Sequence, residues 1–315
     1  GKVAESYAGA QATFVKPSPL TATHVYNTFR QIATTSGKDS MFTKRVLIKK
    51  LLLSASKLET LYLVRALQGK MRIGMAEQSI LTAIAYAHVM SNPDNIFDTK
   101  MTGKLSTAVE QVKQAFCELP DYGELVKTLM ETGDLNRSFI KPGVPVKPML
   151  AKPTNGVTEV MDRMLKSGRF TCDFKYDGMR AQIHMKEDGT VSVFSRNMES
   201  MTSSYPDVVN SIPSTLSNNT KSFIIDTEAV AVDGDGNILP FQVLSTRKRK
   251  DASTDEIKVK VCIYAFDILY YNGESTLKKT LAQRRDILYT AFSQVGNSFK
   301  FATSMNPSTE EEIAE

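Results

Sequence analysis

Four prolines fall within thirteen residues, from Lys141 to Pro153, near the middle of this chain of 315 residues. Proline fixes its own φ and lacks a backbone N–H, so this stretch cannot be helical. Hydrophobic residues recur with a different period on its two sides. The stretch therefore predicts an extended linker, over residues 142–153, between two domains of different architecture.

The residues before this linker carry the 3.6-residue period of amphipathic helices. Leu58, Leu61 and Tyr62 keep this spacing, and so do Ile80 and Ile84. Residues that break helices separate such runs, namely Gly69, Gly74, Asn92-Pro93, Gly103 and Pro120. We therefore expect an all-α domain over residues 21–141, preceded by a frayed tail over residues 1–20.

Beyond the linker the hydrophobic period becomes two, which is typical of strands. Residues 181–186 and 191–195 alternate around a turn at 187–189, and this predicts a hairpin. Two longer apolar runs, 223–232 and 260–269, predict buried strands, and a charged helix is expected from 277 to about 292. Residues 154–315 should therefore form an α+β domain with a mainly antiparallel sheet.

Composition and charge narrow the classes of function. The three cysteines and three histidines have no metal-ligand spacing, and no apolar run approaches the roughly 20 residues of a membrane span. Residues 1–150 carry 19 Lys and Arg against 12 Asp and Glu, whereas residues 151–315 carry 20 against 22. The basic half is suited to a polyanion such as nucleic acid, although the same excess is common in helical domains that bind none.

The segment that says most about chemistry runs Cys172-Asp-Phe-Lys-Tyr-Asp-Gly-Met-Arg180. A lysine is a nucleophile only when its amine is neutral, which requires burial or neighbouring cations. Arg180 and Arg196 could supply that positive field and also grip phosphate oxygens. Gly178 permits a close backbone turn beside Lys175. The segment is suited to attack by Lys175 on a phosphorus atom.

Taken alone, a Lys-x-Asp-Gly string also occurs in solvated surface turns. Two residues inside the later apolar strands favour a site. A carboxylate in a buried strand is costly unless it binds something, so Glu228 is placed to accept a hydrogen bond from a ribose hydroxyl or to hold Mg²⁺. Phe266 offers a ring face for a base, although such a ring is also ordinary core.

The order of these motifs resembles one family, the ATP-dependent DNA ligases, and most closely those of eukaryotes. The motifs that carry the resemblance are Lys-Tyr-Asp-Gly-x-Arg at 175–180, Phe-Ser-Arg-Asn at 194–197, Asp-Thr-Glu-Ala-Val at 226–230 and Tyr-Ala-Phe-Asp at 264–267. Further similar segments lie at 72–79, 240–244, 246–250 and 269–274. The resemblance covers the chain from about residue 40 to its end.

The resemblance implies an enzyme that seals 5′-phosphate/3′-hydroxyl nicks in duplex DNA through a lysyl-AMP intermediate, with ATP and Mg²⁺ as cofactors. Lys175 would attack the α-phosphorus of ATP, and Arg180 and Arg196 would contact AMP or the DNA 5′-phosphate. The nucleotide would be held further by Glu228 at the ribose and metal, by Phe266 packed on adenine, and by Asp173 at the adenine amino group. Asp173 stands where relatives are expected to carry Glu.

The helical half is similar to the DNA-binding domain of these ligases. Over residues 67–77, two glycines let backbone amides approach a phosphate, basic side chains add charge, and a helix begins just afterwards. As isolated features, this loop is also a helical turn with capping glycines, and the basic run at 246–250 is also a solvated loop. The residues expected to contact DNA are Gly69, Lys70, Arg72, Gly74, Arg247 and Arg249.

Family members carry two further motifs and an OB-fold domain, and neither appears before Glu315. We therefore expect a partial adenylation domain over residues 154–315, in a fragment that binds nicked double-stranded DNA but seals it poorly. We expect a monomer of the nucleus or mitochondrion, without membrane contact, whose sliding-clamp partner, if any, binds elsewhere. The alternatives are another lysine nucleotidyltransferase (an mRNA-capping guanylyltransferase or an RNA ligase) and a non-catalytic DNA-binding scaffold.

Overall fold

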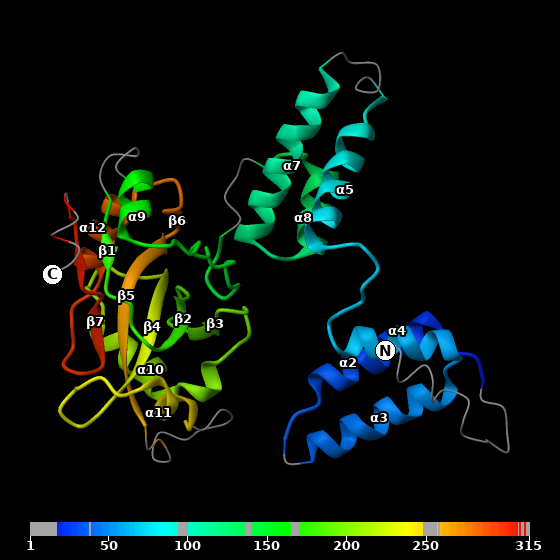
Figure 1. Cartoon of the computed structure of the whole chain (residues 1–315), viewed down its shortest axis with the longest axis horizontal. Helices are drawn as coiled ribbons and strands as arrows, with labels where there is room; N and C mark the ends of the chain where they lie inside the picture. Colours follow the sequence, from blue (N-terminus) through cyan, green and yellow to red (C-terminus); the bar gives the residue numbers. More distant parts are fainter. Residues whose placement is uncertain are drawn as a thin grey trace. The chain divides into compact units, whose positions relative to one another are not determined.

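A computed structural model describes residues 18–37, 39–93, 100–135, 140–164, 170–247, 257, 259–307, 309 and 312. The chain divides into two compact units, residues 1–80 and 81–315. The expected fold class is confirmed, because a helical first part is followed by an α+β part with a curled, largely antiparallel sheet (Figure 1). The domain bounds expected around residues 142–153 stay a prediction.

The described part of the first unit holds three helices, α2 (Ala22–Thr34), α3 (Ser40–Ser54) and α4 (Lys57–Leu67). Ser56 and Glu59 form a reciprocal capping box that fixes where α4 begins. Gly69 ends α4 because its φ of +64° is left-handed. In that conformation the amides of Gly69 and Lys70 donate to carbonyls of the last helical turn.

The second unit begins with helices whose apolar faces share one core. They are α5 (Glu77–Met90), α7 (Met101–Glu118) and α8 (Tyr122–Glu131). Asp121 caps α8 by accepting hydrogen bonds from the amides of Gly123 and Glu124. Within the ranges that the structure covers, no helix has both the length and the apolar character to cross a membrane.

The rest of the second unit is built on a six-stranded sheet of order β3-β2-β4-β5-β6, with β7 beside β5. Every pairing is antiparallel except that of β5 with β7. A separate two-stranded sheet joins β1 to β8. The strands are β1 (Cys172–Asp173), β2 (Met179–Met185), β3 (Val191–Ser195), β4 (Phe223–Val232), β5 (Lys260–Tyr271), β6 (Glu274–Ser275), β7 (Phe299–Phe301) and β8 (Ser304–Met305).

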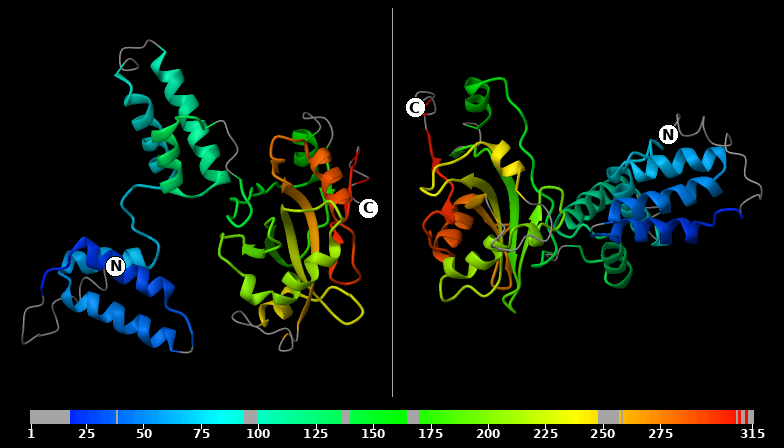
Figure 2. Two further views of the ribbon diagram at one scale, coloured as in Figure 1. Left: turned by 180° about the vertical axis from the view of Figure 1, so that it is seen from behind. Right: turned by 90° about the horizontal axis from the view of Figure 1, so that it is seen from below.

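The six-stranded sheet has an apolar face and a more polar one. Helices and turns cover the apolar face, where Ile183, Ile225 and Ile263 are buried. Figure 1 shows α10 and α11 at one end of the strands and α12 alongside β5, and Figure 2 shows the bend of β5. The remaining helical segments are α9 (Val157–Met164), η2 (Thr202–Ser204), α10 (Pro206–Ser211), η3 (Ile212–Thr215), α11 (Phe241–Ser245) and α12 (Leu281–Ala291).

The proline-rich segment is docked against the polar face of the sheet. Its prolines at 142, 145 and 148 recur every third residue, and the segment begins with a turn in which Gly143 has a φ of +94°. The residues that follow these prolines, Gly143, Val146 and Met149, make hydrogen bonds to side chains of β2. We call residues 142–149 the proline strap. Its contacts show that this part of the predicted linker is held in place.

His184 of β2 should make the stability of the second unit depend on pH. Its ring is fully buried, and burial lowers its pKa from 6.5 to about 3. Below pH 6.5 this histidine is therefore protonated in the unfolded chain but stays neutral in the folded one. The free energy of unfolding should fall by about 1.4 kcal/mol for each pH unit below 6.5, until the pH nears 3.

Thermal unfolding of the parent chain and of His184→Gln between pH 6.5 and pH 5 measures this effect. The midpoint of the parent should fall more steeply than that of the variant, because the variant lacks the titrating ring. Burial raises the pKa of Glu228, which acts in the opposite direction, but it does so equally in both proteins. Equal slopes would contradict the assignment to His184.

Candidate active site

Lys175 lies in the loop between β1 and β2, and this loop is anchored on both sides of the lysine. The amide of Phe174 donates to the carbonyl of Thr303 over 2.9 Å, and the amide of Thr303 donates to the hydroxyl of Tyr176 over 3.1 Å. The Tyr176 ring stacks on Tyr264 of β5, with 4.0 Å between centroids. Lys175 itself is exposed, so the anchored neighbours fix where its amine can reach.

Gly178 lets this loop lie directly against β4. A Cβ at this position would lie 2.4 Å from the carbonyl oxygen of Ala229 and 3.0 Å from Cγ of Glu228 and Cγ2 of Val230. No side chain fits into that space, so glycine is needed here for close approach. The close approach sets the Lys175 loop beside Glu228.

Glu228 is a half-buried carboxylate among three cations. We find no hydrogen bond or ion pair to it within the described part of the chain. Burial raises its pKa, and the positive charges of Arg180, Lys175 and Arg196 oppose that rise. These cations come from β2, from the loop before it and from the turn after β3. The structure therefore brings together four of the residues that the sequence predicts for the site.

Arg180 is held on several sides at the start of β2. Its Nη2 donates to Oδ2 of the buried Asp226 over 2.7 Å, and its Nη1 donates to the carbonyl of Met149 over 3.1 Å. The guanidinium lies over the ring of Phe266, 5.6 Å from the centroid. Its Nε is buried and has no hydrogen-bond partner among the residues described. That N–H is left without a partner in the part of the chain that the structure describes.

Phe266 is the extra residue of a β-bulge in β5. Asp226 of β4 pairs with Asp267, and the next residue, Thr227, pairs with Ala265, so Phe266 has no partner across the strands. A bulge bends the strand and turns a side chain away from regular alternation. The ring is half-buried, with the Arg180 guanidinium over it. The adenine contact expected for Phe266 stays a prediction.

Asp173 is paired with a residue that sequence reasoning missed. Nη2 of Arg285, on α12, donates to both carboxylate oxygens over 2.8 and 2.7 Å, and Nε donates to the carbonyl of Phe266 over 3.3 Å. The preceding residue, Arg284, makes a bidentate pair with Asp267 over 2.7 and 2.8 Å. The only signal in the sequence was two adjacent arginines in the predicted helix. The adenine contact of Asp173 stays a prediction.

Arg247 is buried, and its guanidinium is engaged by contacts within the protein. Its partners are an ion pair with Asp207, the carbonyls of Ser204 and Val259, and the ring of Tyr205 at 4.6 Å. In this conformation the side chain ties α10 and η2 to the chain before β5. Its expected DNA contact stays a prediction, and Arg249 lies outside the described residues.

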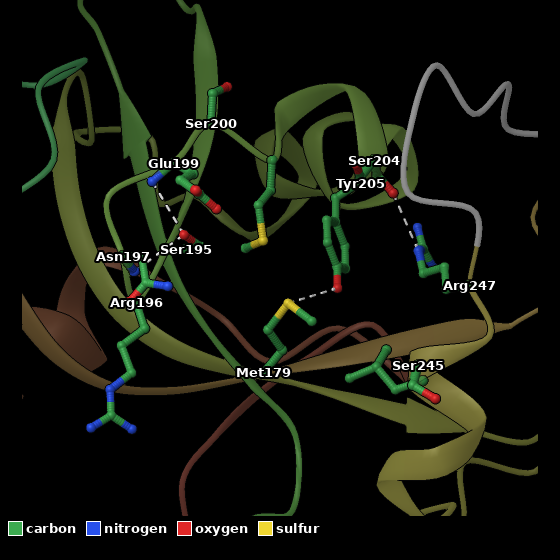
Figure 3. Close-up of a pocket in the computed structure, with 12 residues that line it drawn as sticks. Met179, Ser195, Arg196, Asn197, Glu199, Ser200, Ser204, Tyr205, Ser245 and Arg247 are labelled. Carbon is green, nitrogen blue, oxygen red and sulfur yellow. Dashed lines mark hydrogen bonds between the residues drawn. The ribbon is translucent and has the colours of Figure 1, made fainter. Parts of the chain in front are cut away.

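A pocket of about 410 Å³ opens beside Arg196 (Figure 3). Its walls come from the ends of β2 and β3 and from η2 and α11. In Figure 3 the Arg196 side chain points away from Met179 and Tyr205, whose hydroxyl donates to the Met179 sulfur over 3.6 Å. Neither Lys175 nor Glu228 lines this pocket. The pocket and the cluster around Glu228 therefore have one residue in common, Arg196.

The four residues expected to bind DNA in the first unit lie in one exposed turn between α4 and α5. These are Gly69, Lys70, Arg72 and Gly74. Three of them have left-handed backbone, with φ of +64°, +53° and +75° for Gly69, Arg72 and Gly74. Arg72 is a non-glycine residue in this region, which costs free energy. DNA contact by this turn stays a prediction.

Metal ligands are sparse near the cluster. Across the stretches that the structure describes, no group of three or more His, Cys, Asp or Glu side chains could hold a metal ion. The unpartnered Glu228 offers one oxygen ligand. Magnesium is commonly held by one or two carboxylates together with the phosphates of the substrate, so this single carboxylate fits that ion.

Two family models match the chain. One, described as "ATP dependent DNA ligase domain", matches residues 148–315, and the other, "DNA ligase N terminus", matches residues 1–85. The chain is 41% identical to DNA ligase 1 of Saccharomyces cerevisiae over 99% of its length and 42% of that protein. It is 43% identical to DNA ligase 1 of Arabidopsis thaliana, over 99% of its length and 40% of that protein. The chain thus spans less than half the length of these curated relatives.

Proposed function

The chain belongs to the ATP-dependent DNA ligase family, and on that premise we propose that it joins DNA strands through an adenylate carried on Lys175. The observation that carries the proposal is the cluster around Glu228, in which Lys175 shares one carboxylate with Arg180 and Arg196. An amine whose charge acts on the same carboxylate as those of two guanidiniums is suited to attack on a triphosphate, because both arginines would stabilise the charge that develops on the phosphate oxygens.

Lys175 makes the first bond of the proposed reaction. Its Nζ loses a proton and attacks the α-phosphorus of ATP, the bond to the β-phosphate oxygen breaks, and pyrophosphate leaves. The product is AMP joined to Nζ by a phosphorus–nitrogen bond. The free Nε–H of Arg180, buried and without a partner in the described structure, supports its role as a donor to a phosphate oxygen. Arg196, exposed on the turn after β3, is free to meet the DNA 5′-phosphate.

Glu228, Phe266 and Asp173 would receive the nucleoside. Glu228 has carboxylate oxygens available for a ribose hydroxyl or for Mg²⁺, which when bound would neutralise phosphate charge. The bulge of β5 presents the Phe266 ring beside Arg180. Asp173 would reach adenine while Arg285 holds its carboxylate in place. Together with Lys175, Arg180 and Arg196, these three residues make up the cofactor-binding set that the sequence predicts.

Nicked duplex DNA is the proposed partner. The turn at 69–74 carries two basic residues on exposed backbone, and the basic run at 246–250 adds further charge. We also infer that the protein acts as a monomer in the nucleus, because it is similar to the eukaryotic DNA ligases above, and that any sliding clamp binds outside these residues. Magnesium use and the DNA contacts by Gly69, Lys70, Arg72, Gly74, Arg247 and Arg249 belong to this proposal.

Labelling with nucleotide tests the proposal. The purified protein is incubated with Mg²⁺ and either ATP or GTP labelled at the α-phosphate, and the labelled peptide is identified by mass spectrometry. Label from ATP alone, mapped to Lys175 and transferred to nicked DNA that carries a 5′-phosphate, is the expected result. Label from GTP would instead indicate a guanylyltransferase, and absence of label would indicate a non-catalytic scaffold.

A further inference from the structure

The polar face of β2 grips the backbone of the proline strap. Residues 180, 182 and 184 of β2 share this face because strand side chains alternate. The strap offers them every third residue, namely Gly143, Val146 and Met149. The contacts are Arg180 Nη1 to the Met149 carbonyl at 3.1 Å, the Val146 amide to Gln182 Oε1 at 2.7 Å, and the Gly143 amide to His184 Nδ1 at 3.0 Å.

A second side of the strap meets the helices of the same unit. Val144 packs against the core formed by α5, α7 and α8, and the amide of Lys147 donates to the carbonyl of Cys117 over 3.0 Å. The Lys147 ammonium lies over the ring of Phe116, 5.2 Å from its centroid. The strap is thus held by β2 on one side and by the helices on the other. A strap fixed in this way can hold in place the β2 side chains that bind it.

Gln182 lies at the centre of this contact. Its Oε1 accepts from the amide of Val146, and its Nε2 donates to the carbonyl of Val146 over 3.3 Å, so one amide side chain pairs with both backbone groups of that residue. The same Oε1 lies 2.9 Å from His184 Nε2. Because the oxygen only accepts, His184 must donate from Nε2, which leaves Nδ1 to accept from Gly143.

The remaining N–H of Gln182 reaches the partner of Arg180. Nε2 donates to Oδ1 of Asp226 over 3.2 Å, while Oδ2 of the same carboxylate accepts from Arg180. Arg180 is therefore tied to Gln182 twice. One route runs through Asp226, and the other runs through the strap, whose Met149 carbonyl accepts from Arg180. A change at Gln182 loosens both supports of the guanidinium together.

We propose that Gln182 is a positioning residue for Arg180 in lysyl-adenylate formation, acting through Asp226 and the proline strap. The inference rests on the proposed function. Gln182 is buried and makes its contacts to Val146, His184 and Asp226, so it acts on Arg180 only through them. In the proposed reaction Arg180 stabilises charge in the transition state. Its displacement should therefore lower the rate of adenylylation more than the affinity for ATP.

Single-turnover adenylylation of Gln182→Met tests the inference. Methionine fills a similar volume but supplies none of the four hydrogen bonds. The maximal rate of label transfer to Lys175 should fall about 10- to 100-fold, which is the range for a misplaced reacting group. The apparent dissociation constant for ATP should change by less than about 3-fold. Ile183→Ala, on the apolar face of the same strand, is the matched control for lost stability and should keep the parent rate per folded molecule.

A double-mutant cycle separates positioning from a purely structural role. In an Arg180→Gln background, Gln182→Met should lower the rate by less than about 3-fold, because the group that it positions is gone. Effects that multiply in full would overturn the inference, and so would a parent-like rate in the single variant. Absence of the lysyl adduct in the parent protein would instead contradict the proposed function. The parent protein is measured first, so this outcome is known before any variant is compared.

A strap-side variant covers the case in which Gln182→Met does not fold. Val146→Pro removes the N–H that donates to Gln182 Oε1, fixes φ at this position, and replaces the buried isopropyl group by another apolar group. It should lower the adenylylation rate in the same direction, by about 3- to 10-fold, and should lose most of that effect in the Arg180→Gln background. An unchanged rate in this variant would overturn the inference.

Discussion

Replacement of Lys175 by arginine should abolish the adenylate on this protein. Arginine keeps the positive charge beside Glu228, but its guanidinium stays protonated at neutral pH and is no nucleophile. Label transfer from ATP should therefore fall by about 10⁴-fold or more, the range seen when the nucleophile of a covalent enzyme is removed. Intact-mass measurement after incubation with ATP and Mg²⁺ records the loss directly.

The binding of ATP distinguishes this loss from a collapsed site. Because the charge is conserved, the affinity of Lys175→Arg for ATP should stay within a few-fold of the parent, as measured by equilibrium binding. Lys278→Arg, an exposed lysine before α12, is the matched control and should form adduct at the parent rate. Adduct that persists in Lys175→Arg and maps to another lysine would show that the nucleophile has been assigned wrongly.

Replacement of Gly178 by alanine should be the second most damaging single change. The added Cβ would lie 2.4 Å from a β4 carbonyl oxygen, a backbone atom that cannot rotate away. The loop must then lift from β4, which moves Lys175 away from Glu228. Because a shift of about 1 Å at a reacting group costs about 100-fold, we expect the maximal adenylylation rate to fall at least that far.

A glycine elsewhere in the same unit provides the control for this change. A Cβ at Gly234, in the turn after β4, would meet no atom within 4 Å, so Gly234→Ala should leave both rate and stability near those of the parent. Stopped-flow or quench-flow measurement of label transfer at saturating ATP gives the rate. A Gly178→Ala protein with the parent rate would show that the loop does not need its close approach to β4.

The sequence predicts most of the framework because the framework follows from local periodicity. The run at 223–232 is β4 to the residue, and the alternating segments around 187–189 are the β2–β3 hairpin. The 3.6-residue spacing likewise predicts α4 and α5. The helices bury one face each and β4 is buried on both, so in each segment the arrangement of apolar residues reports the structure directly.

Features that depend on pairing between distant segments escaped sequence reasoning. The bulge at Phe266 is a mismatch of register between two strands, and nothing in the residues of β5 alone marks it. Arg285 and Asp173 are 112 residues apart in the sequence, so their ion pair cannot be predicted from the residues around either one. Arg247 lies in a basic run that is typical of a solvated loop. In the structure it is buried instead, where Asp207 and two backbone carbonyls bind its guanidinium.

The proline strap shows the same limit at a shorter range. Four prolines in thirteen residues correctly predict a non-helical segment, but their composition also suits a spacer that touches nothing. The period of three in the strap and the polar Arg180-Gln182-His184 alternation in β2 were both visible. Only the fold places them against each other, and Gln182 matters because of that placement.

The anchoring of the Lys175 loop by Thr303 has a consequence for how the protein is made. Tyr176 and Thr303 are separated by 127 residues, and β1 likewise pairs with β8 at the far end of the described chain. A growing polypeptide on the ribosome therefore exposes the lysine long before its anchor has been synthesised. Until translation passes Thr303, the nascent chain therefore lacks the contact that fixes the position of the lysine loop.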